Sequence, residues 1–165
     1  MLKTFYLTDG KLSQTGAGPA ALYVYVNPDE KEKAQLITTS AIDEHTFHSS
    51  LDPEEVGRIE FEDNHLAAII KKPKKYSSED NFIFKISSVG LFLFTDKLIV
   101  VSGEDDLTWE GRLFSRLHSV RDIFMRVIFH YVVHFEEHLK VIRRISEELE
   151  REINVAVSKK DLLHM

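Results

Sequence analysis

Hydrophobic and polar residues change their spacing along the chain, and the change separates a mixed first part from a helical second part. In the first part, short apolar runs alternate with charged segments. Residues 4–7 (TFYL) and 21–26 (ALYVYV) are rich in β-branched and aromatic side chains, which is typical of strands. The Asn27-Pro28 pair that follows predicts a helix, because asparagine caps helices and proline fits the first turn. A second helix is expected over residues 42–51.

Further strands are expected between residues 58 and 102. Residues 58–61 (RIEF) alternate polar and apolar, as in a half-buried strand, whereas residues 66–70 (LAAII) are continuously apolar, as in an interior strand. Residues 76–81 (YSSEDN) form a polar connection. Residues 82–102 (FIFKISSVGLFLFTDKLIVVS) then predict three strands, which Gly90 and a tight turn at residues 95–97 separate.

The last third of the chain has the period of an amphipathic helix. A short helix is expected around Trp109, and the capping box of Ser119 and Asp122 predicts a new helix start at Val120. From there, apolar residues recur at spacings of three and four up to residue 153, with one gap of seven centred on His138 and without Gly or Pro. Such a helix is a rod of about 50 Å, longer than the roughly 30–35 Å body of a domain of this length. The rod must therefore project, or pack along another chain.

The apolar stripe of this rod predicts partner helices. A single projecting amphipathic helix is poorly stable in water, so the stripe is expected to pack against helices of identical chains. The residues expected at this oligomer interface are Phe124, Tyr131, Phe135, Ile142, Ile145 and Leu149.

These elements predict an α/β (α+β) fold. We expect a mixed sheet of about six strands flanked by helices in αβα layers, followed by a long projecting stalk helix. The predicted division is an α/β domain over residues 1–118 and a stalk over residues 119–165. With 165 residues, 43% of them hydrophobic, the chain is long enough for one domain with a real core.

Charge and composition narrow the classes of function. The net charge of -6 disfavours a nucleic-acid partner. From residue 27 to residue 63, eleven Asp or Glu stand against three Lys or Arg, whereas residues 71–75 (KKPKK) are basic. Two interpretations stay open: both patches are solvated surface, or the acidic one attracts cations or a basic neighbour. The chain has no cysteine, which excludes disulfides, thiolate zinc sites and cysteine nucleophiles.

An enzyme is not expected from the motifs. Residues 15–19 (TGAGP) lack the spacing and the lysine of a P-loop, and no Gly-x-Ser-x-Gly sequence occurs. The carboxylates lie in alternating, exposed contexts that give no reason for shifted pKa values. The sequence shows neither a signal peptide nor an apolar run long enough to span a bilayer.

Three histidines at spacings of four residues are the candidate metal ligands. His130, His134 and His138 share one stripe of the long helix, and Glu137 lies beside it. Histidines at i and i+4 can share a zinc or nickel ion, whereas magnesium prefers oxygen ligands and water. The alternative is a structural role, in which the histidines pack in a bundle and bond to carbonyls or carboxylates.

The order of these segments resembles the cytoplasmic domain of the CorA family of magnesium transporters. The matching segments are ALYVYVNPDEKEKAQLI, LDPEEVGRIEFEDNHLAAIIKKP, GLFLFTDKLIVV and SVRDIFMRVIFHYVVHFEEHLKVIRRISEELEREI. The resemblance implies a homopentameric divalent-cation transporter, whose αβα domains and long helices form a funnel below two membrane helices per chain. It further implies magnesium as the ion, with cobalt, nickel or zinc in some relatives.

The sequence departs from the family pattern in two respects. It contains neither the Gly-Met-Asn signature nor a membrane helix, so we expect it to be a soluble fragment of a longer transporter. The regulatory acids of the family are also unmatched. Phe47, His48 and Ser49 occupy the place of a Leu-Glu-Asp sequence, and VIFHYVV has none of the family's aspartates.

The sequence therefore predicts a regulatory and funnel domain of a CorA-like transporter, on the cytoplasmic side of the cell inner membrane. It is expected to sense a divalent metal ion (Mg²⁺, or Co²⁺, Ni²⁺ or Zn²⁺) and to assemble into homo-oligomers. The alternative is a free-standing scaffold that uses the same helix as a coiled-coil seam and transports no ion.

Overall fold

A mixed sheet forms the centre of the molecule, in a computed structural model that describes residues 1–74, 85–109 and 111–163. Its seven strands lie in the order β2-β1-β3-β7-β6-β5-β4, and β3 pairs with β7 in parallel while every other pair is antiparallel. The strands are β1 (Leu2–Thr8), β2 (Lys11–Ser13), β3 (Leu22–Val26), β4 (Arg58–Phe61), β5 (Leu66–Pro73), β6 (Ile86–Leu93) and β7 (Leu98–Ser102). The predicted mixed sheet is confirmed, and the short β2, which folds back on β1, was not expected.

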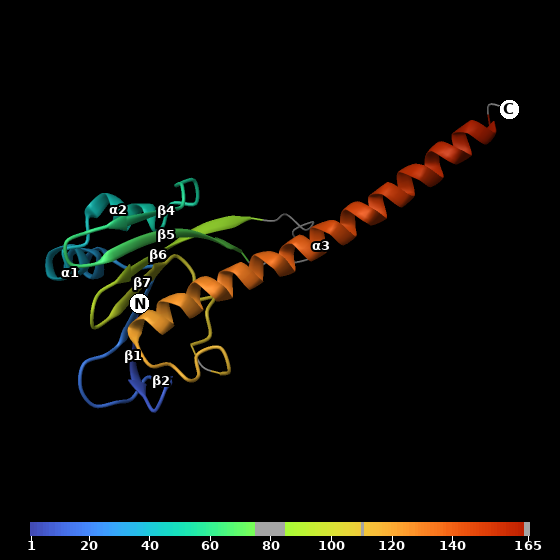
Figure 1. The fold of residues 1–165 in the computed structure, drawn as a ribbon. Helices are drawn as coiled ribbons and strands as arrows, with labels where there is room; N and C mark the ends of the chain where they lie inside the picture. Colours follow the sequence, from blue (N-terminus) through green and yellow to red (C-terminus); the bar gives the residue numbers. More distant parts are fainter. Residues whose placement is uncertain (75–84, 110, 164–165) are drawn as a thin grey trace.

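Two short helices cover one face of the sheet (Figure 1). They are α1 (Glu30–Ser40) and α2 (Glu44–Ser49), and they bury Leu36 and Phe47 against β3, β5, β6 and β7. The cap of α1 is Asp29 rather than the expected Asn27, because its carboxylate accepts the backbone N–H groups of Lys31 and Glu32.

The long helix α3 (Val120–Leu163) lies across the opposite face and then leaves the body of the molecule (Figure 1). It begins where the capping box predicts, since the Asp122 carboxylate accepts the backbone N–H of Ser119 at 3.0 Å. Its 44 residues correspond to about 66 Å. The first turns contribute Ile123, Val127 and Tyr131 to the larger core cluster, so the predicted αβα layering is confirmed. The predicted stalk therefore begins with a segment that belongs to the body.

Two local predictions between β5 and α3 are wrong, and a third lies partly outside the described residues. Gly90 does not end a strand, because β6 runs through it with continuous pairing to β5 and β7. No helix forms around Trp109 among the described residues 103–109 and 111–119. Instead this segment lies as a loop whose Trp109 and Phe114 rings are 5.2 Å apart in the core. The strand expected at residues 82–84 lies outside the described residues, as does the connection at 76–81.

The edge strand β4 alternates polar and apolar residues as predicted, but its apolar side chains face solvent and its polar ones face inward. Arg58 and Glu60 face α2 and are half-buried, whereas Ile59 and Phe61 are 58% and 83% exposed on the α3 face. Arg58 and Glu60 face inward because the hydroxyls of Ser49 and Thr46 on α2 offer hydrogen-bond partners there.

Candidate functional site

The candidate site lies on α3 at the point where the helix leaves the sheet. Successive histidine rings follow the helix, with centroid distances of 6.1 Å from His130 to His134 and 4.8 Å from His134 to His138. The first two side chains are half-buried, and His138 is buried. The spacing of four residues therefore places the three rings in one row, as the sequence predicts.

Burial sets the protonation of this histidine row. Loss of solvent lowers the pKa of His130, His134 and His138, and the neighbouring imidazole lowers it further for His134 and His138. The imidazoles are therefore neutral at pH 7, which is the form that binds a metal ion. The Nδ1 atom of His134 is buried and has no hydrogen-bond partner among the described residues.

The row does not by itself make a complete metal site. Within the described part of the chain, no group of three or more His, Asp or Glu side chains converges as metal ligands would. Glu137 is exposed on the same helix. Two neighbouring histidines can supply two ligands, and the remaining positions would have to come from water or from another chain.

A buried ion pair lies beside the histidine row, and the sequence prediction missed it. Lys72 on β5 is fully buried, and its Nζ lies 2.8 Å from Asp106 Oδ1 and donates to Ser102 Oγ at 2.9 Å. The Tyr131 ring of α3 lies over the same ammonium, 6.0 Å from ring centroid to Nζ. Because Lys72 belongs to the basic run at 71–75, that run is not wholly solvated surface.

The inward position of Lys72 could have been predicted from the alternation of side chains along β5. Leu66, Ala68 and Ile70 point to the α3 face, and residue 72 continues that alternation. The acceptor Asp106 could not be found in this way, because it comes from the irregular segment after β7.

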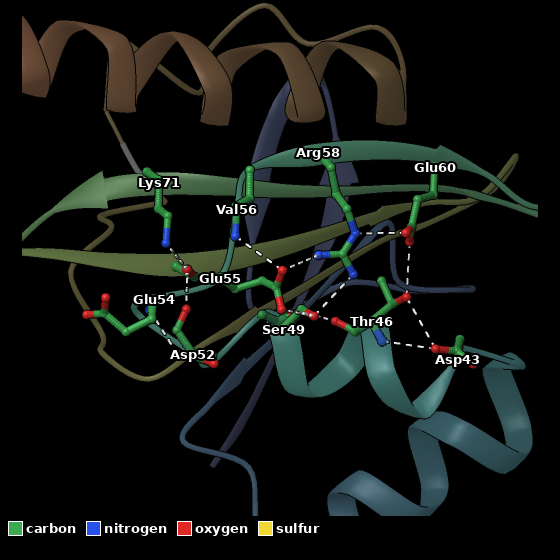
Figure 2. A network of polar contacts seen from close by, with 12 residues as sticks. Asp43, Thr46, Ser49, Asp52, Glu54, Glu55, Val56, Arg58, Glu60 and Lys71 are labelled. Carbon is green, nitrogen blue, oxygen red and sulfur yellow. Dashed lines mark hydrogen bonds and ion pairs between the residues drawn. The ribbon is translucent and has the colours of Figure 1, made fainter.

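A second polar network joins α2 to β4 (Figure 2). The Arg58 guanidinium donates to Glu60 at 2.7 Å and to Ser49 at 3.1 Å, and it pairs with Glu55 at 3.0 Å. The hydrogen bond from Arg58 lowers the pKa of Glu60, and the hydroxyl of Ser49 lowers that of Glu55. These carboxylates, which belong to the acidic region at 27–63, are thus satisfied internally.

The predicted interface residues divide into two groups. Phe124 and Tyr131 are buried in the chain's own core, because the first turns of α3 dock on the sheet, and they are not available to another chain. Phe135 and Ile145 are half-buried, while Ile142 and Leu149 are exposed. Of the six predicted interface residues, these last four remain candidates for contact with another chain. None of the described helices is long and apolar enough to cross a membrane.

The fold has clear counterparts among solved structures. The soluble domain of CorA from Methanocaldococcus jannaschii superposes with a TM-score of 0.61 at 14% identity, over 79% of this chain and 54% of that one. The chain folds like the soluble domain of CorA. The complete CorA magnesium transporter of the same organism matches with a TM-score of 0.60 at 16% identity, over 92% of this chain and 50% of that one. The CorA-like chain thus spans about half the length of the solved structures that it matches.

Comparison by sequence gives a different result. No family model and no curated protein matches this chain. The CorA-like fold is therefore recognised by the arrangement of its strands and its long helix, and at 14–16% identity the comparison carries no residue-level site.

Proposed function

We propose that this chain is the cytoplasmic, funnel-forming part of a CorA-like divalent-cation transporter. The observation that carries the proposal is the likeness of 92% of the chain to half of a complete magnesium transporter. In this proposal the sheet and its helices make subunit contacts and sense ions. The helix α3 forms one wall of a multi-chain funnel and transmits movement toward the pore.

Assembly is part of the same proposal. The chain forms a homo-oligomer, a pentamer in the full-length protein, on the cytoplasmic side of the cell inner membrane. The exposed Ile142 and Leu149 support this, because apolar side chains on a free helix gain stability when another helix covers them. Membrane helices that this sequence does not contain would complete the pore.

A transport assay tests the proposal directly. The full-length protein is produced in a bacterial strain that lacks its own magnesium uptake, and growth and ion uptake are measured with magnesium, cobalt, nickel and zinc. We expect uptake of magnesium above the vector control. A full-length protein without membrane segments, or one without uptake of any of the four ions, would contradict the proposal and favour the free-standing scaffold.

The ion-sensing role is tested on the 165-residue chain. We propose that His134 with His130 or His138 binds a soft divalent ion, since neutral imidazoles at i and i+4 suit zinc or nickel. At a hundredfold excess over Kd, zinc or nickel should raise the melting temperature by about 5–10 °C. His134→Ala should abolish this shift.

The exposed His118 supplies the matched control. His118→Ala should keep the full zinc-dependent shift, because this residue precedes the helix and lies outside the histidine row. If magnesium, nickel and zinc change neither the melting temperature nor the oligomer size, ion sensing by this chain is refuted. Transport by the full-length protein would be unaffected by that result.

A further inference from the structure

The loop between β7 and α3 presents arginines on its outer side. Phe114 and Leu117 point into the core and are 1% and 2% exposed, whereas Arg112 and Arg116 are exposed. The loop passes beneath the N-terminal end of α3, next to the β1–β2 hairpin (Figure 1). Its buried side chains therefore fix which of its residues face solvent.

The hairpin holds this loop in place. Ser115 forms an antiparallel bridge with Lys11, and the Leu117 backbone N–H donates to the Gly10 carbonyl at 2.9 Å. Arg116 between them has a φ of 58°, a left-handed conformation that costs energy for a residue with a side chain. The two backbone contacts on either side maintain this conformation, so the position of Arg116 is fixed.

The helix α3 supplies the opposite wall of a hollow. Arg126 and Phe129 lie three residues apart on one helix face, and the Phe129 ring is 56% exposed. The hollow has a volume of ≈ 480 Å³, and its lining residues are Arg112, Leu113, Ser115, Arg116, Arg126 and Phe129. A neighbouring hollow of ≈ 450 Å³ shares Arg112 and Ser115 and adds Lys11.

The described residues that line these two hollows include basic side chains. Among the described residues, no acidic side chain lines either hollow, and Lys11, Arg112, Arg116 and Arg126 form no ion pair. The chain as a whole carries a net charge of -6, so the positive charge is local. Converging like charges in a concave surface repel one another and attract an anion.

We propose that this hollow binds a nucleoside polyphosphate. Guanidinium groups bind phosphate oxygens in a bidentate manner, and three of them suit a chain of phosphates. The exposed ring of Phe129 and the apolar side chain of Leu113 offer a surface on which a base can stack. The volume lies within the range of small-molecule sites, about 300–1,000 Å³.

The position of the hollow favours a soluble ligand over a lipid headgroup. Arg126 lies near the start of α3, and about 55 Å of helix separate it from the other end at Leu163. In the proposed transporter, the membrane lies beyond that distant end. The nucleotide proposal itself does not depend on ion transport.

Titration of the 165-residue chain with ATP tests the proposal, by calorimetry at low salt and without divalent ions. We expect the double variant Arg112→Gln/Arg116→Gln to bind ATP at least about tenfold more weakly, since each guanidinium contributes charge-assisted hydrogen bonds. The matched control is Arg144→Gln/Arg151→Gln, which removes the same charge from exposed positions on the far half of α3. The control should bind ATP like the parent chain.

Two further probes separate the nucleotide from other anions. Phe129→Ala should weaken ATP binding and leave inorganic tripolyphosphate unchanged, because only the base contacts the ring. Equal affinity of the parent chain for tripolyphosphate and ATP would overturn the nucleotide assignment. Stronger binding to phosphatidylglycerol vesicles than to ATP, or equal losses in the two double variants, would overturn it as well. Circular dichroism of each variant confirms that the fold is intact.

Discussion

At the scale of single residues, Lys72 shows how tertiary surroundings redefine a charged side chain. It lies in a basic run, yet it is fully buried between β5 and α3 and is held by Asp106 and Ser102. A buried ion pair adds little net stability, because desolvation offsets the attraction between its members. Removing one member is costly, since the other then remains charged and without its partner.

The Lys72–Asp106 pair gives the first stability prediction. Lys72→Met should lower the free energy of unfolding by about 3–5 kcal/mol, because it leaves the Asp106 carboxylate largely buried without its ammonium. Urea unfolding followed by circular dichroism measures the change. The double variant Lys72→Met/Asp106→Asn should recover part of the loss, because no unpaired charge then remains.

An exposed pair nearby provides the control. Lys74 lies 2.9 Å from Glu104, and both side chains are about two-fifths exposed. Lys74→Met should change the free energy of unfolding by less than about 1 kcal/mol, as for other surface pairs. Equal losses for the two single variants would show that burial does not determine the strength of the Lys72 contact.

At the scale of elements, β6 shows that a glycine inside an apolar run need not end a strand. Gly90 lies opposite Ile69 on one side and Val101 on the other, in unbroken pairing. A Cβ atom at this position would meet the Ser50 side chain at the end of α2. The glycine is therefore required for the close approach of α2 to the sheet and not for a turn.

This packing predicts the effect of an added methyl group. Gly90→Ala should lower the free energy of unfolding by about 1–3 kcal/mol, because the new Cβ overlaps Ser50. The loss should be smaller in a Ser50→Gly background, which a double-mutant cycle measures. Gly103→Ala is the control, since its Cβ would meet nothing within 4 Å, and it should stay within about 0.5 kcal/mol of the parent. Equal effects at both glycines would refute the packing explanation.

At the scale of the whole molecule, the two halves of α3 have different environments. The first half shares the core of the sheet, and the second half projects away from the body (Figure 1). From residue 146 to residue 157 every side chain is exposed. A helix that projects alone gains little from packing, so its apolar residues favour association. The acidic region and the arginine-lined hollow occupy separate parts of the body, on opposite faces of the sheet.

We predict that the chain self-associates through the projecting half of α3. Ile142→Glu/Leu149→Glu should shift the oligomer toward monomer in sedimentation velocity, because a charge replaces each apolar contact. Arg144→Glu/Glu148→Arg exchanges exposed charges on the same segment without changing the net charge, and it should associate like the parent. A parent chain that is monomeric at all concentrations would contradict self-association through α3.

The sequence by itself determined the local elements whose signals are local. Strand composition predicted β3 and β5, the box of Ser119 and Asp122 predicted the start of α3, and the uninterrupted period predicted a long rod. The two strands, the helix start and the long rod are determined by propensity, capping and amphipathic spacing, which act over a few residues. The CorA-like order of elements was likewise readable before the structure.

Only the tertiary structure decided how these elements meet. It turned the apolar side of β4 outward, buried Lys72, and placed Phe124 and Tyr131 in the core. Each of these outcomes depends on partners far away in the chain, such as Asp106 for Lys72. The energy of a side chain depends on which groups surround it, and residues distant in sequence supply those groups once the chain has folded.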